Sequence, residues 1–295
     1  MHTLTNQHSV SSASNEPWQI RMARRSFKKR EKLHILKQLL YPIPDDWRCL
    51  DLGCARGSLS YFLRQWGGRW VSVDLDQDNV QSTLQLVRHG VVQVGPGLLP
   101  FRPATFDLVV SMDFLEHVQD DDAVFDEMVR LVKPGGLLVI GTPTTGRGLV
   151  LNRLKPRLGL TLEHYGHVRE GYHPDDLVRG MEQRGLRVFK VNTYARFLTE
   201  SVELFLNALY IRKQKRSEPP VQRRDGVIAP ATEQEFRRIS GTFKIYQKIY
   251  PIIWAFTRLD CLIAPLSRIP FFRGYAVIVA GRKTGNLSDP PVERS

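Results

Sequence analysis

Short apolar runs alternate with amphipathic stretches along most of this 295-residue chain. Runs with the length and composition of buried β-strands lie near 48–53, 70–75, 91–95, 106–112, 136–142, 187–194 and 275–282. Helical periodicity marks several stretches between them, near 58–66, 77–88, 121–132 and 174–184. Because strands and helices alternate, the pattern predicts an α/β fold, with a seven-stranded, mostly parallel sheet covered by helices on both faces.

A glycine turn follows the first predicted strand. Asp51 ends the strand, and Gly53 and Gly57 would let the backbone turn tightly into the next helix. Asp74 closes the second strand, where its carboxylate can accept hydrogen bonds from both hydroxyls of a ribose. Three residues separate the two glycines, unlike the Gly-x-Gly-x-x-Gly of dinucleotide-binding dehydrogenases. The pattern indicates a nucleotide-like cofactor and disfavours a nicotinamide or a flavin.

This turn resembles the first motif of class I S-adenosylmethionine-dependent methyltransferases, in which acidic, glycine and small residues alternate. Asp51, Gly53, Ala55 and Gly57 occupy the motif positions here. The resemblance spans about residues 47 to 193 and continues through Leu99-Pro100-Phe101, 106–113, 115–118 and 131–140. It is similar in order and spacing to the small-molecule branch, which includes ubiquinone- and menaquinone-type and sugar or natural-product enzymes. The resemblance implies a Rossmann-like sheet and S-adenosylmethionine as cofactor.

The same resemblance implies which residues hold the cofactor. Asp51 would orient the turn or reach the methionine amino group, while Gly53 and Gly57 would admit the cofactor against bare backbone. Asp74 would bind the ribose, and a helix cap ahead of Gln77 is its structural alternative. The other candidate cofactor-binding residues are Cys54, Ala55, Leu75, Gly95, Leu98, Leu99, Ser111 and Asp113.

Gly95 departs from the family pattern. Relatives carry an acidic residue at this position, where it holds the adenine amino group, and the following Pro96 has no N–H to donate. Adenine recognition would therefore differ, through Leu98, Leu99 or other backbone groups. Because of this departure, the alternative remains that the chain is a binding protein that has the methyltransferase fold but does not catalyse methyl transfer. The intact glycine turn argues against that alternative.

Three histidines are the candidate catalytic residues. His117 follows the fourth strand together with Asp113, and it could accept a hydroxyl proton because imidazole titrates near neutral pH. A histidine that only lines or braces the pocket is the alternative. His164 and His167 lie in a long basic connection, 142–172, at the sheet edge where open α/β folds bind ligands. Their spacing also permits metal ligation, but the sequence reveals no third ligand nearby, so no metal is predicted.

A long segment, 195–274, separates the last two predicted strands, which family members usually join by a short hairpin. Helical stretches near 198–213 and 233–263 predict a helical cap. Its most apolar part, 249–257, is far shorter than the roughly 20 apolar residues that cross a bilayer. Those aromatics would pack the cap onto the sheet, line an apolar substrate tunnel or face a membrane surface. The predicted domains are a disordered tail at 1–16, the methyltransferase domain at 17–194 with 275–284, the cap, and a disordered tail at 285–295.

The net charge of +12 is concentrated before the glycine turn, where residues 18–40 carry eight Lys or Arg and one Glu. This segment would be the solvated face of an amphipathic helix, or a contact for anionic lipid or a phosphorylated substrate. The inward face would hold Phe27, Leu33, Ile35, Leu36, Leu39 and Leu40. Three scattered cysteines and a polar start without a secretory leader predict a cytoplasmic protein, with peripheral association at the cytoplasmic membrane face as the variant.

The resulting functional expectation is methyl transfer to a small or lipid-linked acceptor that is both apolar and anionic, on oxygen rather than nitrogen or carbon. A basic isoelectric point near 9.8 raises the alternative of an RNA methyltransferase. The Ser111–Phe114 segment lacks the Asp/Asn-Pro-Pro-aromatic sequence of nucleic-acid amino methyltransferases, and none of the cysteines follows a proline. The sequence therefore disfavours a nucleic-acid partner, and it predicts no oligomeric state.

Overall fold

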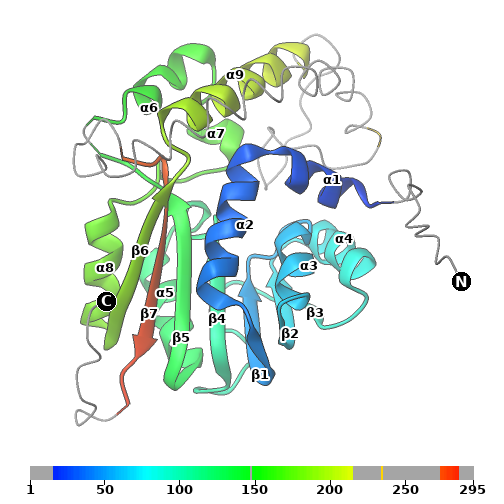
Figure 1. The fold of residues 1–295 in the computed structure, drawn as a ribbon, viewed down its shortest axis with the longest axis vertical. Coiled ribbons are helices and arrows are strands. Elements are labelled where there is room, and N and C mark those ends of the chain that lie inside the picture. Colours follow the sequence, from blue (N-terminus) through cyan, green and yellow to red (C-terminus); the bar gives the residue numbers. More distant parts are fainter. Residues whose placement is uncertain (1–15, 147, 215–233, 235–272, 286–295) are drawn as a thin grey trace, which may run out of the picture.

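A computed structural model describes residues 16–146, 148–214, 234 and 273–285. These residues form a seven-stranded sheet of order β3-β2-β1-β4-β5-β7-β6 (Figure 1). The strands are β1 (Ile43–Leu52), β2 (Gly67–Asp74), β3 (Val91–Gln93), β4 (Phe106–Met112), β5 (Val132–Pro143), β6 (Leu186–Tyr194) and β7 (Ala276–Lys283). Only β7 pairs antiparallel with its neighbours within this sheet, which confirms the predicted mostly parallel α/β fold.

Helices cover both faces of the sheet. Successive residues of β5 alternate between the two faces, so that Leu138 packs against α5 and α8 while Leu137 packs against α2 and α3. Strands buried on both sides are apolar throughout, which explains why their sequences read as continuous hydrophobic runs. The larger helices are α1 (Trp18–Arg25), α2 (Phe27–Leu40), α3 (Ser58–Arg64), α4 (Gln77–Val87), α5 (Asp121–Leu131), α8 (Pro174–Gln183) and α9 (Phe197–Gln214).

The basic N-terminal segment forms two helices, so the prediction of one amphipathic helix is wrong in this respect. Ser26 separates α1 from α2 with an extended backbone, and its Oγ accepts a hydrogen bond from the Lys29 N–H at 3.2 Å. Such an N-cap favours a new helix start. The predicted inward face of α2 is confirmed, since Phe27, Leu36 and Leu40 are buried.

The connection after β5 contains three short helices: α6 (Val150–Leu154), the 3-10 helix η2 (Pro156–Leu158) and α7 (Leu162–Tyr165). Leu149, Leu151 and Leu160 of this connection pack in one apolar cluster with Leu204 and Ala208 of α9. Figure 1 shows α6, α7 and α9 beyond the ends of the parallel strands. The connection and α9 therefore form a layer over the edge of the sheet where ligands bind in open α/β folds.

The predicted cap is described only in part. Its first helix is present as α9, whereas the stretch predicted as helical near 233–263, apart from residue 234, lies outside the described residues, as do 1–15 and 286–295. Among the helices that the structure describes, none is long and apolar enough to span a membrane.

Candidate functional site

The strand order places the candidate residues at one edge of the sheet. Strands β1 and β4 are neighbours, while β2 lies on the far side of β1 and β5 on the far side of β4. The chain connections therefore leave in opposite directions and open a crevice between β1 and β4. Gly53 follows β1, Asp74 ends β2 and Asp113 follows β4, so all three meet at this crevice.

The glycine turn requires both of its glycines. Gly53 and Gly57 each have φ of +79°, a left-handed conformation that side chains rarely adopt. A Cβ at Gly53 would lie 2.5 Å from the ring of Phe114, and one at Gly57 would lie 2.9 Å from the Thr83 Cα. The Thr83 hydroxyl also donates to the Ala55 carbonyl at 2.8 Å and so ties the turn to α4. Both glycines are therefore required by the packing of the turn against Phe114 and Thr83, and contact of their backbone with a cofactor stays a prediction.

Asp74 is anchored by the turn that it faces. One carboxylate oxygen accepts from the Ala55 N–H at 2.8 Å, and the other accepts from the Asp76 N–H at 3.0 Å and from the Asn79 amide at 3.2 Å. A carboxylate offers about four acceptor positions, so Asp74 keeps capacity for a ligand hydroxyl. The helix-cap alternative for Asp74 is wrong, because Asp76 is the N-cap of α4.

Asp51, two residues before Gly53, joins β1 to α3 and β2 through its side chain. Its side chain is buried, and it accepts hydrogen bonds from the Ser60 hydroxyl and, at 3.0 Å, from the Ser72 hydroxyl. Burial raises the pKa of Asp51, although these two hydroxyls and the nearby Arg64 oppose the shift. Asp51 lies outside the residues that line the pockets described below, so of its two predicted roles, orienting the turn fits this buried position better and stays a prediction.

Two hollows flank Gly53. The β2 hollow, about 100 Å³, is lined by residues that include Asp74, Leu75, Val94, Gly95, Leu99 and Phe114. The β4 hollow, about 160 Å³, is lined by residues that include Cys54, Ala55, Phe62, Met112, Asp113 and Lys32. The Gly53 backbone lines both, so the two hollows lie next to each other at the glycine turn, and together they are called the groove around Gly53.

The β2 hollow contains an acid that the sequence analysis missed. Gly95 lines it, and a Cβ there would meet no atom within 4 Å. Glu127 of α5 reaches the same hollow, where its Oε1 accepts from the Leu99 N–H at 2.7 Å and from Arg130. Leu98, a predicted cofactor contact, is 81% exposed and lies outside the lining. No local pattern marks Glu127, because only the packing of α5 brings it to the hollow.

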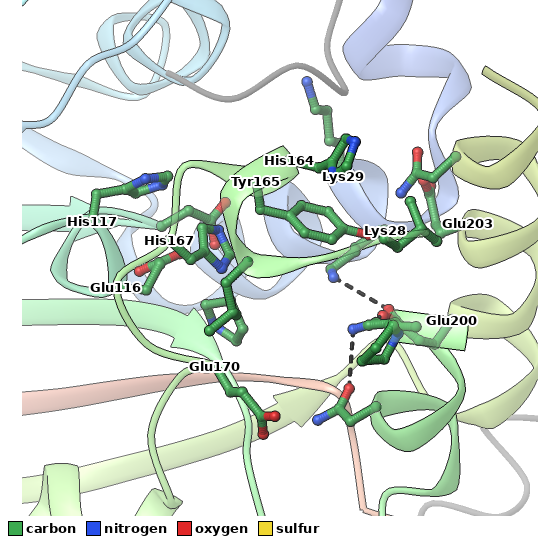
Figure 2. A pocket seen from close by; sticks show the side chains of 18 residues that line it. Lys28, Lys29, Glu116, His117, His164, Tyr165, His167, Glu170, Glu200 and Glu203 are labelled. Atoms are coloured by element: carbon green, nitrogen blue, oxygen red, sulfur yellow. Dashed lines mark hydrogen bonds and ion pairs between the residues drawn. The ribbon is translucent and has the colours of Figure 1, made fainter. Parts of the chain in front are cut away.

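A third and larger space, the acceptor pocket, lies between α2, the end of β4, the connection and α9. It has a volume of about 350 Å³, and all three predicted histidines, His117, His164 and His167, line it (Figure 2). Lys29 and Asp113 line both this pocket and the β4 hollow. The groove around Gly53 therefore adjoins the acceptor pocket at these two residues. Ser111, another candidate, is buried with its hydroxyl unbonded within the described part of the chain.

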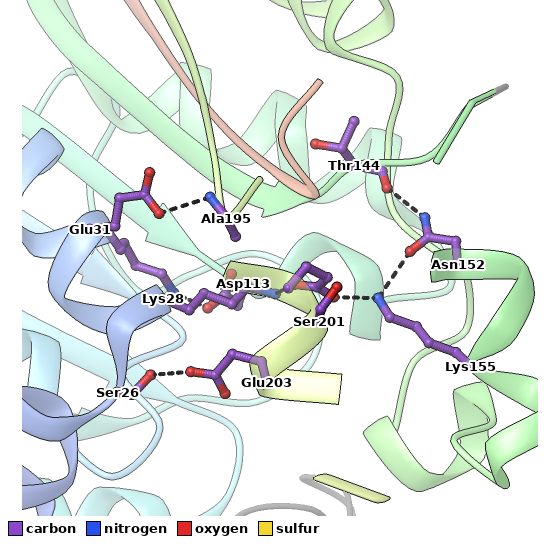
Figure 3. Close-up of polar contacts among 12 residues, drawn as sticks. Ser26, Lys28, Glu31, Asp113, Thr144, Asn152, Lys155, Ala195, Ser201 and Glu203 are labelled. Carbon is purple, nitrogen blue, oxygen red and sulfur yellow. Dashed lines mark hydrogen bonds and ion pairs between the residues drawn. The ribbon is translucent and has the colours of Figure 1, made fainter. Parts of the chain in front are cut away.

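Ion pairs join the helix α2 and the connection after β5 to the helix α9 beside the acceptor pocket (Figure 3). Glu200 of α9 accepts from Lys28 at 3.2 Å and from Lys155 at 2.7 Å, and its side chain is only 4% exposed. Burial opposes ionisation of Glu200, but Lys155 and Lys28 outweigh it and lower its pKa to about 2. Lys32 pairs with Asp113 after β4. These lysines of α2 therefore face the site, contrary to the expectation of a wholly solvated basic face.

Lys29 is the lysine of this pocket whose side chain forms no hydrogen bond or ion pair among the described residues. Burial and the neighbouring Lys32 lower the pKa of Lys29 to about 8. At pH 7 the ammonium group is therefore still mainly charged. It supplies a positive charge at the junction between the β4 hollow and the acceptor pocket.

Glu116, His117 and His167 gather at one end of the pocket, away from Glu200 (Figure 2). Burial and Asp113 raise the pKa of Glu116 to about 8, and burial and His117 lower the pKa of His167 to about 3. The His117 Nδ1 donates to the Gly166 carbonyl at 2.8 Å. Sequence analysis found no third potential ligand beside His164 and His167, whereas the fold places Glu116 and His117 beside His167.

Known proteins resemble this chain in the part that builds the crevice. Residues 50–140 match the family described as "Methyltransferase domain". A ubiquinone biosynthesis O-methyltransferase of Xylella fastidiosa is 36% identical over 101 residues, which are 32% of this chain and 41% of that protein. A dimethylglycine N-methyltransferase of Parasynechococcus marenigrum is 32% identical over 139 residues, 43% of this chain and 48% of that protein. The chain spans less than half the length of these curated relatives.

The fold is also similar to solved structures. Phosphoethanolamine N-methyltransferase 2 of Haemonchus contortus, in complex with S-adenosyl-L-methionine, aligns with a TM-score of 0.52 at 19% identity. The alignment covers 87% of this chain and 53% of that one. Residues 50–140 therefore carry the signature of the methyltransferase domain family, within a fold similar to that of a solved methyltransferase.

Proposed function

We propose that the protein transfers a methyl group from S-adenosylmethionine to an oxygen of a small acceptor bound in the acceptor pocket. One observation carries this proposal: the groove around Gly53 and the acceptor pocket adjoin, and both are lined by Lys29 and Asp113. A donor and an acceptor held in adjoining spaces can react in line, and such positioning supplies much of the rate enhancement of a two-substrate reaction.

The residues of the groove fit the cofactor. Gly53 lines the groove with bare backbone, Asp74 offers a remaining acceptor position for a ribose hydroxyl, and Leu99 lies beside the space that would take the adenine. Glu127 brings a carboxylate to that space in place of the acid missing at Gly95. When bound, the cofactor supplies a methyl group activated on a positively charged sulfur.

The acceptor pocket favours an acceptor that carries both an anionic group and an apolar part. Lys28 and Lys155 both pair with Glu200, whereas the Lys29 ammonium forms no ion pair among the described lining residues and so remains available to an anion. Leu160, Leu162 and Tyr165 supply apolar surface to the same pocket. Prenylated phenolic acids and lipid-linked sugars combine these features. The relative named as a ubiquinone biosynthesis O-methyltransferase supports oxygen as the methylated atom.

Calorimetry with S-adenosylmethionine tests the first half of this proposal. We expect the wild-type chain to bind with micromolar affinity and Asp74→Asn to bind at least tenfold more weakly. Asp78→Asn is the matched control, because this nearby carboxylate in the first turn of α4 is exposed and lines neither hollow. Absence of binding by the wild type would favour instead a binding protein that keeps the fold without the reaction.

Labelled cofactor tests the second half. Incubation with radiolabelled S-adenosylmethionine and a panel of phenolic, carboxylic and lipid-linked acceptors should place label in an organic extract. Label in none of these acceptors, despite cofactor binding, would contradict the proposed acceptor class. A salt-sensitive transfer of label to RNA would support the nucleic-acid alternative.

A further inference from the structure

We infer that Glu116, His117 and His167 bind a divalent transition-metal ion at one end of the acceptor pocket. One carboxylate oxygen and one nitrogen of each imidazole lie within 4.8 Å of one another. Three ligand atoms that share one ion at about 2.1 Å in tetrahedral geometry lie about 3.4 Å apart. Side-chain adjustments of about 1 Å would therefore bring the three atoms onto a common ion.

The Glu116 carboxylate has the environment of a ligand without its ion. The side chain is fully buried, and neither oxygen has a hydrogen-bond partner within the described part of the chain. Burying a carboxylate without a partner is costly, and native structures almost always pair such groups. The nearby lysines do not pair with it, since Lys32 bonds Asp113 and Lys28 bonds Glu200. A bound cation would supply the missing partner.

Both histidines are prepared for ligation. The hydrogen bond from Nδ1 of His117 to the Gly166 carbonyl leaves Nε2 as the nitrogen with a free lone pair. A second hydrogen bond of this kind typically fixes the orientation of a metal-binding histidine. The two imidazole rings are perpendicular, with centroids 4.7 Å apart. The His167 side chain forms no hydrogen bond within the described part of the chain, so its nitrogen lone pair is also available.

The backbone holds the two halves of the site together. Glu116 and His117 belong to the 3-10 helix η1 (Leu115–His117), while His167 lies 50 residues later, after α7. The Val168 N–H donates to the Glu116 carbonyl at 2.9 Å, next to His167 in the chain. The bond from His117 to Gly166 joins the same two segments. These contacts fix the ligand set without any contribution from the metal.

The donor set indicates the class of metal. Two imidazoles and one carboxylate favour zinc, manganese, iron(II) or cobalt over magnesium and calcium, which prefer oxygen ligands. Three protein ligands leave coordination positions open, and the cluster borders the acceptor pocket. If the proposed function holds, an acceptor oxygen would take an open position, where the ion lowers the pKa of its hydroxyl. Metal binding itself does not depend on methyl transfer.

The test is metal binding by the full-length chain after treatment with a chelator. Titration with Zn²⁺ and Mn²⁺, followed by calorimetry, should give one site of micromolar or tighter affinity, with Mg²⁺ at least tenfold weaker. Glu116→Gln and His167→Gln should each weaken binding by 10-fold or more. Glu170→Gln and His164→Gln are matched controls in the same pocket but outside the cluster, and they should retain wild-type affinity.

Circular dichroism of each variant establishes that it is folded, and either of the two ligand variants suffices if the other is unstable. Absence of a site in the wild type, or equal affinity in wild type and ligand variants, would overturn the inference. Because no cofactor or acceptor is added, failure here leaves the proposed methyl transfer intact. Conversely, metal binding by a chain that does not bind S-adenosylmethionine would separate this site from the proposed reaction.

Discussion

Lys155 and Glu200 form an ion pair of 2.7 Å that joins the connection after β5 to the helix α9. Lys28 of α2 reaches the same carboxylate at 3.2 Å. One buried acid therefore links three segments that are far apart in the sequence, and together they enclose the acceptor pocket. The pocket depends on this acid for its shape as much as for its charge.

Glu200→Gln should destabilise the protein, because it leaves two lysines near the pocket without their counter-charge. Removing one partner of a buried ion pair typically costs about 3 to 5 kcal/mol. Urea unfolding followed by circular dichroism measures the change. Glu203→Gln is the control, since the Glu203 carboxylate accepts a hydrogen bond from the Ser26 hydroxyl at 2.8 Å but forms no ion pair among the described residues. Equal stability of both variants would contradict the structural role of Glu200.

The pH dependence of the free energy of unfolding should reveal the ionisation of Glu200. The pKa of Glu200 is lowered from 4.5 to about 2 in the folded protein, so folding is favoured when the carboxylate is ionised. This contribution, about 3 kcal/mol, is present above pH 4.5 and is lost as the pH falls from about 4.5 to 2. Unfolding free energies measured across this range should fall more steeply for the wild type than for Glu200→Gln. Parallel curves would contradict the lowered pKa.

Alanine substitutions should distinguish a glycine that is packed against its neighbours, Gly53, from one that faces open space, Gly95. Gly53→Ala places a Cβ 2.5 Å from the Phe114 ring at a φ of +79°, which should cost about 1 to 3 kcal/mol and weaken cofactor binding. Gly95→Ala meets no atom within 4 Å and should leave both stability and affinity nearly unchanged. Thermal unfolding and calorimetry with S-adenosylmethionine measure the two effects. A harmless Gly53→Ala would show that the turn tolerates a side chain.

The substitution Gly95→Asp should raise the affinity of the protein for S-adenosylmethionine. The open space at Gly95 accommodates a side chain, and a carboxylate there could accept a hydrogen bond from the adenine amino group. One hydrogen bond contributes about 1 kcal/mol, so we expect S-adenosylmethionine affinity to rise about fivefold. Gly95→Asn is the matched control for size. Equal affinities of Gly95→Asp and wild type would mean that the adenine does not approach this position.

Lys29 should make acceptor binding depend on pH. Its pKa of about 8 means that the ammonium is charged at pH 7 and becomes neutral between pH 8 and 9. The KM for an anionic acceptor should therefore rise over that interval, and Lys29→Met should raise the KM at pH 7 and remove the dependence. Lys37→Met, at the other end of α2, is the control. A KM that stays constant across pH 7 to 9 would exclude Lys29 from the anion site.

The sequence by itself determined the sheet and the cofactor groove, because both depend on local signals. Apolar runs predict strands wherever a chain is buried on both faces, and the positive φ at Gly53 and Gly57 is a local demand that only glycine meets freely. Asp74 and the turn are joined by neighbouring parallel strands, so their meeting follows from strand order alone. The break at Ser26 was missed, since a capping serine inside a basic run is a weak signal.

Only the tertiary structure decided the acceptor pocket and its charges. Glu127, Glu200 and Lys28 reach their sites because separate helices pack together, and no spacing along the chain encodes those distances. His164 and His167 are three residues apart in sequence, yet the folded chain pairs His167 with Glu116 and His117, 50 residues earlier. Burial then sets the ionisation of these groups, because removal from water alters the free energy of a charge in a way that the sequence does not specify.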